Sequence, residues 1–547
     1  MAFDTTLTDG VVKRHTDAGF WGRTHPDYFD RAVQAHPGRR AVVDRGQTHT
    51  FAELDRLVAR AAYSFLDHGI RPGHVVAIQL PGWVEFLVGH YALARIGAVT
   101  LPLLLDYRVR EMEFMLNFAG AHAVIVPGVF RDTDHAALLR EVLPQTPSVK
   151  RVFVVGETSA EWTPFAELID PAIDDRYDPE RVARCRPVST DVLEIVFTSG
   201  TTGNPKAILH THDTFMCVAE RMVRDFEYAS DDVVLGLSPL AHQHGILGHL
   251  APPVVAGATT ALLERFQPVA ALELIEAFGV TIVVGVPSHA FMLLGSEALD
   301  RCRTKAWRLF FCSGATLPME VATRLYQAFG CRITSAYGMS EAAYCTYSRM
   351  DDPFEVVASS CGRPAAGSEI RIYDGDGAEC ATGVVGEIAM RGPNVFVGYH
   401  SNLDTARALT NEAGFFRSGD LGLMREDGNL VVVGRAKDMI LRGGDNVYPS
   451  EIEEDLLRHP KIANVAVVGY ADERLGERVC ACVIPLAGQS ITLEEIRAFL
   501  EGRIARYKIP DRLETLNAFP MTGTGKVQKT RLREVIAGAR PKEDANG

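Results

Sequence analysis

The stretch Phe197-Thr-Ser-Gly-Thr-Thr-Gly-Asn-Pro-Lys206 is the most informative part of the sequence, and it follows the apolar run of residues 192–197. This order predicts a buried strand that ends in a loop. Glycine permits unusual backbone dihedrals, while hydroxyl and N–H groups donate hydrogen bonds to phosphate oxygens. Lys206 adds a positive charge. The spacing differs from the GxxxxGK[ST] loop of Walker-type NTPases, and a Gly/Ser/Thr run taken alone is more often an ordinary surface loop than a phosphate loop.

The segments around this loop alternate between helical and strand patterns. Residues 51–68 carry apolar side chains at helical spacing and stop at Gly69, and residues 74–80 form a short apolar run. The same order returns in residues 269–278 and 280–286. Strand–helix–strand units predict a mainly parallel sheet with helices on both faces.

The sequence changes character after about residue 368. Gly375-Asp-Gly377 and Asp427-Gly428 separate short β-rich runs, which predicts hairpins. A smaller set of helices and strands follows, at residues 449–458, 465–470, 478–485 and 493–503. We therefore predict an α/β protein with two parts. Residues 1–435 form a large N-terminal domain of mixed, mostly parallel sheets layered with helices, plus a β-rich subdomain. Residues 436–547 form a small, mobile C-terminal α/β domain.

The composition excludes several classes of protein. With 547 residues, of which 47% are hydrophobic and 23% charged, the chain has the mix of a folded protein with at least two domains. A net charge of −13 argues against non-specific binding to nucleic acid. No stretch approaches the roughly 20 apolar residues that cross a bilayer, and no signal peptide is visible.

The ten cysteines are scattered and contain no CxxC pair, which is typical of a reduced, cytoplasmic protein. Cys480 and Cys482 are the one close pair, and we expect their side chains on opposite faces of a strand.

Four further motifs follow the phosphate loop in a characteristic order. They are Tyr337-Gly-Met-Ser-Glu341, Ser418-Gly-Asp420, Gly434-Arg-Ala-Lys-Asp438 and Gly523-Thr-Gly-Lys526. Together they resemble the adenylate-forming (AMP-binding) superfamily, in its acyl-CoA synthetase and acid–CoA ligase branch. The resemblance implies that ATP and Mg²⁺ are cofactors and that a carboxylate is converted to an acyl-adenylate. Such an enzyme must hold the carboxylate near the α-phosphate, neutralise charge and exclude water.

The resemblance also implies which residues bind the nucleotide. In the phosphate loop these are Thr198, Ser199, Gly200, Thr201, Thr202, Gly203 and Lys206, and on the adenine side Ser313, Gly314, Ala315, Gly338 and Met339. Tyr337 is implied to stack on adenine, and Ser340 to donate a hydrogen bond to the α-phosphate. Glu341 is implied to hold Mg²⁺, a hard cation that suits carboxylate oxygen. Taken alone, this motif favours a strand-to-loop turn with a solvated glutamate.

Three further positions are implied to act at the ribose and at a hinge. Asp420 would accept hydrogen bonds from the two ribose hydroxyls, and Arg435 would reach the ribose or a phosphate. Lys437 matches the hinge about which the small domain rotates. Alone, Asp420 is equally a turn residue, because Ser-Gly-Asp is common in loops.

Two residues are implied to act directly on the acid. Lys526, in a glycine-rich segment, would bridge the substrate carboxylate and the α-phosphate, where an ammonium offsets the repulsion between two anions. His242, in Pro239-Leu-Ala-His-Gln-His-Gly245, would guard the carboxylate site. The alternative for His242 is a histidine satisfied within its own loop. No third ligand has the spacing of a zinc site. The catalytic residues predicted are thus Lys526, Glu341 and His242.

The run Leu441-Arg-Gly-Gly-Asp-Asn-Val-Tyr-Pro449 resembles that of acyl-CoA ligases, and Gly443 and Gly444 would let a pantetheine arm pass close to the backbone. The chain ends soon after Lys526 and shows no carrier domain. We therefore expect free coenzyme A as the acceptor.

The acid is only broadly defined by the sequence. The segments expected to line its pocket, residues 242–248, 283–289 and 335–339, are mostly small or apolar, which predicts an aliphatic, alicyclic or aryl acid. Transfer to a carrier protein, activation of nitrite for attack by an amine, and an inactive binding protein on the same fold stay as alternatives. No nucleic-acid or integral-membrane partner is expected, and a homodimer is left open.

Overall fold

The computed structural model describes residues 3–198, 206–315, 317–443, 445–472, 474–521 and 527–538. The chain forms two compact units. The first comprises Met1–Ile370 and Met390–Phe416, and the second comprises Arg371–Ala389 and Arg417–Gly547. The predicted boundary at residue 435 lies inside the second unit. The boundary at residue 435 stays a prediction.

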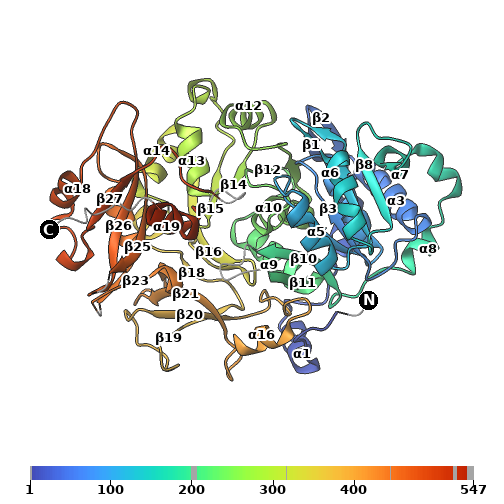
Figure 1. Cartoon of the computed structure of the whole chain (residues 1–547). Coiled ribbons are helices and arrows are strands. Elements are labelled where there is room, and N and C mark those ends of the chain that lie inside the picture. Colours follow the sequence, from blue (N-terminus) through green and yellow to red (C-terminus); the bar gives the residue numbers. More distant parts are fainter. Residues whose placement is uncertain are drawn as a thin grey trace. The chain divides into compact units, whose positions relative to one another are not determined.

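A seven-stranded sheet organises the N-terminal part of the first unit (Figure 1). Its strands, in spatial order, are β11 (Lys206–Thr211), β10 (Val192–Thr198), β4 (Val99–Pro102), β3 (Val75–Ile78), β5 (Ala123–Pro127), β8 (Arg151–Val155) and β9 (Thr163–Pro164). All neighbouring strands are parallel except β10 and β11, which are antiparallel.

Helices cover both faces of this sheet, as predicted. Alternate residues of β3 enter different cores: Val76 and Ile78 pack with α3 and α4, whereas Val75 and Ala77 pack with α5 and α6. The helices are α1 (Asp9–Asp17), α2 (His25–Ala35), α3 (Phe51–Asp67), α4 (Val84–Arg95), α5 (Val109–Phe118), α6 (His135–Val142), α7 (Phe165–Leu168) and α8 (Pro179–Ala183).

A nine-stranded sheet forms the rest of the first unit. In spatial order it contains β18 (Arg363–Pro364), β17 (Ala343–Tyr347), β16 (Arg332–Met339), β15 (Leu309–Ser313), β14 (Ile282–Gly285), β12 (Val233–Gly236), β13 (Thr259–Ala261), β1 (Arg40–Asp44) and β2 (Gln47–Thr50). The run from β16 to β1 is parallel, and the outer pairs are antiparallel. The prediction of mixed, mostly parallel sheets is therefore confirmed.

Helices also cover both faces of the larger sheet. One core holds α12, α13 and α14 against Val283 and Phe310, and the other holds α9 and α10 against Val284 and Phe311. The remaining helices of the first unit are α9 (His212–Asp225), α10 (Gln243–His249), α11 (Ala251–Ala256), α12 (Pro268–Phe278), α13 (Pro287–Leu294), α14 (Met319–Phe329), α15 (Phe354–Ser359) and, away from these cores, α16 (Leu403–Ala408).

Local chemistry sets the ends of the predicted helices. Thr50 and Glu53 form a reciprocal capping box at the start of α3. Gly69, two residues past its end, has a φ of 86°. Gly279 ends α12 with a φ of 63°. The predicted helices at 51–68 and 269–278 are thereby confirmed to within one residue at each end.

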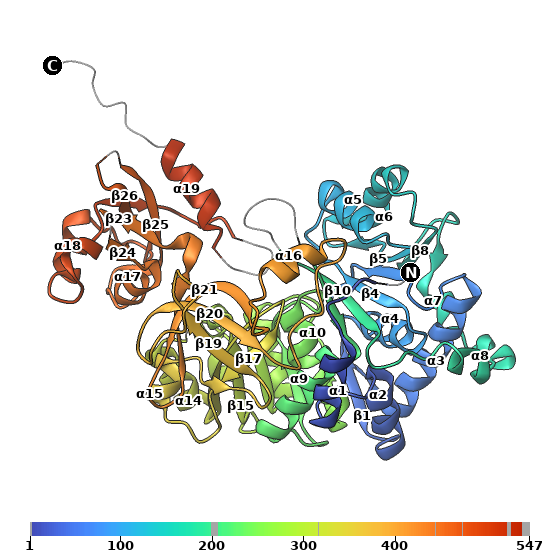
Figure 2. The ribbon, with the colours of Figure 1, turned by 90° about the horizontal axis from the view of Figure 1, so that it is seen from below.

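The second unit contains two sheets. One is formed by β19 (Glu369–Tyr373), β20 (Gly386–Arg391), β21 (Phe416–Met424) and β22 (Leu430–Arg435). The other contains β24 (Asp445–Val447), β23 (Ile440–Arg442), β26 (Gly476–Pro485), β25 (Ile462–Asp472) and β27 (Arg512–Thr515). The hairpin expected at Asp427-Gly428 joins β21 to β22. Figure 2 shows α17 (Pro449–Leu456) and α18 (Leu493–Leu500) on one side of β25 and β26, and α19 (Lys529–Gly538) on the other.

The expectation for Cys480 and Cys482 is wrong. Both side chains lie in the core beneath α19, because residues two apart on a strand share a face. All ten cysteines are free thiols. Among the described residues, no helix is both long enough and apolar enough to span a membrane.

Candidate active site

The predicted nucleotide motif forms the tight turn between β16 and β17. A Cβ atom on Gly338 would lie 1.8 Å from the carbonyl oxygen of Ala343, so only glycine fits there. The Ala342 N–H donates to the Met339 carbonyl at 3.0 Å, and Ala343 adopts a φ of 48°. This geometry places Ser340 and Glu341 at the tip of the turn.

Glu341 is a buried residue with 7% of its surface exposed. The hydroxyl of Tyr399 donates to Glu341 Oε1 at 2.9 Å. The backbone N–H of Phe396 donates to the Glu341 carbonyl at 2.7 Å. Both the carboxylate and the backbone of Glu341 are therefore held, and the alternative of a solvated glutamate is excluded.

The adenine-side residues lie at the end of the neighbouring strand. Ser313 ends β15 opposite Ala336 of β16, and Gly314 follows with a φ of 88°. Gly314 and Ala315 are exposed, whereas Ser313 and Tyr337 are buried. Carboxyl ends of adjacent parallel strands meet at one edge of a sheet, where ligands of α/β proteins commonly bind. The structure thus brings together the 313–315 and 337–341 segments.

Lys206 lies on β11, where it is paired with Thr198 of β10. Its Nζ atom lies 4.8 Å from the centroid of the Tyr399 ring, a cation–π distance. Tyr399 reaches this position because its segment pairs with β11, through the Leu209 N–H to the Gly398 carbonyl at 3.0 Å. Ser199, Gly200, Thr201, Thr202 and Gly203 lie outside the described residues.

His210 is a buried residue that the sequence reasoning missed. Its Nε2 lies 2.7 Å from the Ser340 carbonyl oxygen, and its Nδ1 lies 3.1 Å from Thr214 Oγ1. A carbonyl oxygen only accepts hydrogen bonds, so Nε2 carries the proton and Nδ1 accepts from the Thr214 hydroxyl. Burial lowers the pKa of His210 to about 4. The ring is therefore neutral at pH 7.

His242 is engaged within its own loop. It precedes α10, and its Nδ1 accepts a hydrogen bond from the His244 N–H at 3.2 Å. This contact is the alternative considered from the sequence, while a role at the substrate stays a prediction. Among the described residues, no group of three His, Cys, Asp or Glu side chains could hold a metal ion.

The neighbourhood of α10 is more polar than the sequence predicted. Gly248 packs against β14, where an added Cβ would lie 2.6 Å from Val284 Cγ1. Glu194 of β10 is fully buried, and burial raises its pKa to about 8, with Gln243 as its polar neighbour. Glu194 interrupts the otherwise apolar run of residues 192–197, and helices cover both faces of this sheet, so the sequence did contain a signal for a buried carboxyl that the sequence reasoning missed.

The remaining predicted residues lie in the second unit. Asp420 on β21 faces Arg435 on β22, and Arg435 Nε lies 3.2 Å from Asp420 Oδ1. Lys437 follows in a short 3-10 turn, and burial and the charge of Arg435 lower its pKa. Gly443 has a φ of 61°. Gly444 and Lys526 lie outside the described residues.

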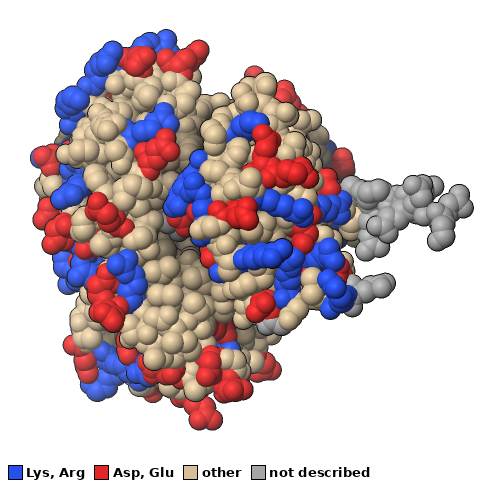
Figure 3. Space-filling view, turned by 90° about the vertical axis from the view of Figure 1, so that its left-hand side faces the viewer, with Lys and Arg blue, Asp and Glu red and all other residues tan. Residues whose placement is uncertain are grey.

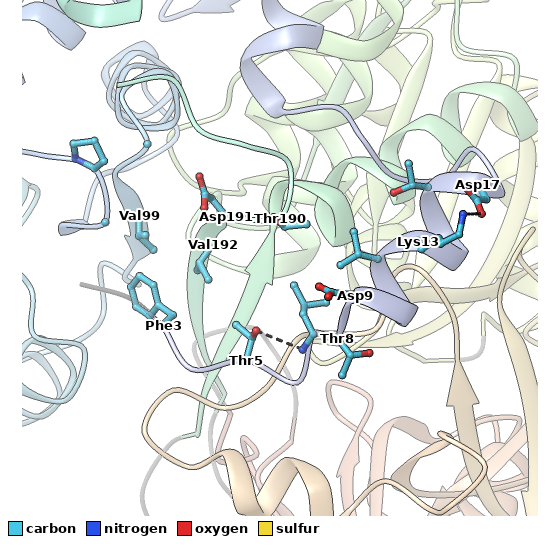
Figure 4. A pocket seen from close by; sticks show the side chains of 16 residues that line it. Phe3, Thr5, Thr8, Asp9, Lys13, Asp17, Val99, Thr190, Asp191 and Val192 are labelled. Carbon is cyan, nitrogen blue, oxygen red and sulfur yellow. Dashed lines mark hydrogen bonds and ion pairs between the residues drawn. The ribbon is translucent and has the colours of Figure 1, made fainter. Parts of the chain in front are cut away.

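An open groove of about 990 Å³ lies elsewhere in the first unit. Figure 4 shows side chains of α1 and of the ends of β4 and β10 around it, including Lys13, Val99 and Asp191. None of its lining residues belongs to the predicted site. We therefore give it no role in the chemistry.

Comparison with known proteins defines the class. The family described as AMP-binding enzyme matches residues 29–400, and its C-terminal domain matches residues 451–526. The chain belongs to this family and is an adenylate-forming acid ligase. The superfamily and the fold predicted from the motifs are thereby confirmed.

Individual relatives cover nearly the whole chain. The medium-chain fatty-acid–CoA ligase of Escherichia coli (strain K12) is 35% identical over 538 residues, which is 97% of this chain and 94% of that protein. The 2,3-dihydroxybenzoate-AMP ligase of Bacillus subtilis (strain 168) is 34% identical over 543 residues, 97% of each chain. ATP-bound MatB from Rhodopseudomonas palustris superposes with a TM-score of 0.84 at 27% identity, covering 94% of this chain and 99% of that one.

Proposed function

We propose that the protein is an ATP-dependent carboxylic acid–CoA ligase. Carboxylate and ATP give acyl-AMP and diphosphate, and coenzyme A then gives acyl-CoA and AMP. The observation that best supports this is the held Glu341 carboxylate, with Lys206 against the same Tyr399 ring. An anchored anion and a cation beside a phosphate loop suit a magnesium–triphosphate ligand.

The donor set at Glu341 fits magnesium. Mg²⁺ is usually bound through one or two carboxylates together with substrate phosphates. The single buried carboxylate of Glu341 matches this pattern. When bound, the ion would neutralise phosphate charge. In the proposal Ser340 donates to the α-phosphate, and Tyr337 stacks on adenine beside Ser313, Gly314, Ala315, Gly338 and Met339.

The second unit supplies the ribose and hinge residues in this proposal. Asp420 accepts the ribose hydroxyls, a role compatible with its contact to Arg435 because a carboxylate accepts several hydrogen bonds. Lys437 is the hinge. Lys526 bridges the substrate carboxylate and the α-phosphate, and His242 lies on the substrate side.

The acceptor is proposed to be free coenzyme A. The Arg442-Gly-Gly-Asp-Asn-Val-Tyr-Pro449 run supports this, as does the similarity to the fatty-acid–CoA ligase of E. coli. Gly443 and Gly444 would accommodate the pantetheine arm, and the acid is aliphatic, alicyclic or aryl.

A carrier protein is the second candidate acceptor. The salicyl-AMP ligase / salicyl-S-ArCP synthetase of Mycobacterium tuberculosis is 34% identical over 525 residues, nearly as similar as the fatty-acid–CoA ligase. An amine acceptor has support from the amide bond synthetase McbA of Marinactinospora thermotolerans, at 27% identity and a TM-score of 0.81.

Diphosphate and AMP release across a panel of carboxylic acids tests the proposal. We expect diphosphate with the right acid and ATP alone, and stoichiometric AMP and acyl-CoA only when coenzyme A is added. Release of AMP that depends on a carrier protein or an amine, and not on coenzyme A, would contradict the proposed acceptor. Absence of diphosphate with every acid would contradict adenylation itself.

The surface and the thiols support the remaining expectations. On the face shown in Figure 3, Lys and Arg side chains are interspersed with Asp and Glu, and the net charge of −13 is the reason for proposing no nucleic-acid partner. The free cysteines are consistent with a reducing, cytoplasmic location. A homodimer stays a prediction that light scattering would test.

A further inference from the structure

We propose that His210 and Tyr399 are positioning residues that hold the Ser340–Glu341 peptide in the geometry needed to bind magnesium–ATP. This inference rests on the proposed function. Neither residue was among the motif residues assigned to the nucleotide. Both contact that motif through hydrogen bonds from distant parts of the chain.

Three hydrogen bonds converge on two consecutive residues of the turn. His210 donates to the Ser340 carbonyl at 2.7 Å, Phe396 N–H to the Glu341 carbonyl at 2.7 Å, and Tyr399 to the Glu341 carboxylate at 2.9 Å. Because a peptide unit is planar, holding the two carbonyl oxygens sets the orientation of both peptides that flank the Glu341 Cα. The carboxylate contact then sets the side chain.

The His210 side chain is well suited to hold the Ser340 carbonyl in one orientation. The ring is completely buried and neutral, and the Ser340 carbonyl determines its tautomer, which leaves Nδ1 to accept from the Thr214 hydroxyl on the other side. Ser340 follows the last residue of β16, so its carbonyl receives no hydrogen bond from the β16–β17 pairing. A buried donor there replaces the strand partner that the turn lacks.

Tyr399 links the two oppositely charged residues of the proposed site. Its hydroxyl donates to Glu341 while its ring faces the Lys206 ammonium. A phenol is protonated at neutral pH, and a carboxylate oxygen only accepts, so the Tyr399 hydroxyl is the donor in this hydrogen bond. The ring also packs against the ring of Phe396, whose centroid lies 4.8 Å away at an interplanar angle of 59°.

The tyrosine test compares Y399F with Y347F. Tyr347 is a buried tyrosine of β17 whose hydroxyl donates to Asp225, away from the turn, so Y347F removes an equivalent bond. The Mg²⁺ dependence of ATP binding is measured by calorimetry. We expect Y399F to raise the Mg²⁺ concentration for half-maximal ATP affinity by about tenfold, since a hydrogen bond to a charged group is lost. Y347F should leave it unchanged.

The histidine test compares H210L, H210Q and H135L. His135 is another buried, hydrogen-bonded histidine, with Gln79 as its partner. We expect H210L to weaken ATP binding and to raise KM for ATP about tenfold, with a smaller effect on kcat. H210Q should restore most of the affinity, because an amide N–H can reach the Ser340 carbonyl. H135L should lower Tm only.

Each outcome decides the inference. Unchanged ATP affinity and Mg²⁺ dependence in Y399F and H210L, or equal losses in the controls, would overturn it. If H210L fails to fold, the comparison of Y399F with Y347F still tests the inference. A wild-type protein that binds no ATP at all would instead refute the proposed function, so the two failures are distinguishable.

Discussion

At the scale of single residues, the carboxyl group of Glu194 is completely buried. Its folded-state pKa of about 8 lies above the ordinary value of 4.5, so the folded protein binds a proton that the unfolded chain releases at neutral pH. The contribution of this group to stability is therefore full below about pH 4.5 and is lost as the pH rises towards 8.

We predict that E194Q is more stable than the wild type at pH 8, by about 2–4 kcal/mol, with the gain vanishing near pH 4.5. The neutral amide keeps the shape of the side chain and its contact with Gln243. Urea unfolding at pH 5 and pH 8 measures the difference. The exposed E412Q serves as the control, and a gain of E194Q that is equal at both pH values would contradict the assignment.

At the scale of elements, three helices of the first unit share a histidine cluster. His25 of α2, His90 of α4 and His212 of α9 are all buried. The rings of His25 and His90 lie 5.3 Å apart, and the His25 N–H donates to His212 Nδ1 at 3.2 Å. Burial lowers the pKa of each ring, for His90 to about 4. The cluster is neutral, and the helices pack around it.

The sign of the resulting pH dependence is opposite to that of Glu194. The unfolded histidines take up protons below their ordinary pKa of 6.5, whereas the folded ones do not until far lower. Stability is thus complete above pH 6.5 and falls as the pH is lowered towards 4. We predict that lowering the pH from 7 to 5 reduces the free energy of unfolding of H90L by about 2 kcal/mol less than that of the wild type. Urea midpoints at both pH values measure this, and an identical loss in both proteins would refute it.

Short-range sequence patterns predicted some of the helices and hairpins but not the geometry of the β16–β17 turn. Glycine stops and the hydrophobic period predicted α3 and α12, and Asp427-Gly428 predicted the β21–β22 hairpin, because these signals act within a few residues. They could not predict how tight the β16–β17 turn is or which residues support it. Its tightness depends on the approach of Gly338 to Ala343, and its support comes from other elements.

At the scale of the whole molecule, the proposed chemistry divides between two units. Glu341, Lys206 and His242 belong to the first, and Asp420, Lys437 and Lys526 to the second. A lysine that joins two anions is needed for adenylation, whereas transfer of the acyl group to a thiol breaks a bond already activated.

We predict that K526A loses diphosphate-forming activity by at least 100-fold, as expected for loss of a charged contact in the transition state. It should keep thiol transfer from preformed acyl-AMP. The two half-reactions are measured separately. K529A is the matched control, because Lys529 instead pairs with Glu453 at 2.6 Å. Equal loss of both half-reactions in K526A would contradict the proposal that Lys526 acts in adenylation but not in thiol transfer.

The sequence by itself determined the class of chemistry and the types of element, since motifs and periodicity are properties of neighbouring residues. Only the tertiary structure decided what supports the motif. His210 lies 130 residues from Ser340, and Tyr399 lies 58 residues from Glu341. Their hydrogen bonds form because the pairing of β11 with the 397–400 segment brings these residues together. A contact made by folding leaves no local pattern, because the physical constraint is a distance in space and not a spacing along the chain.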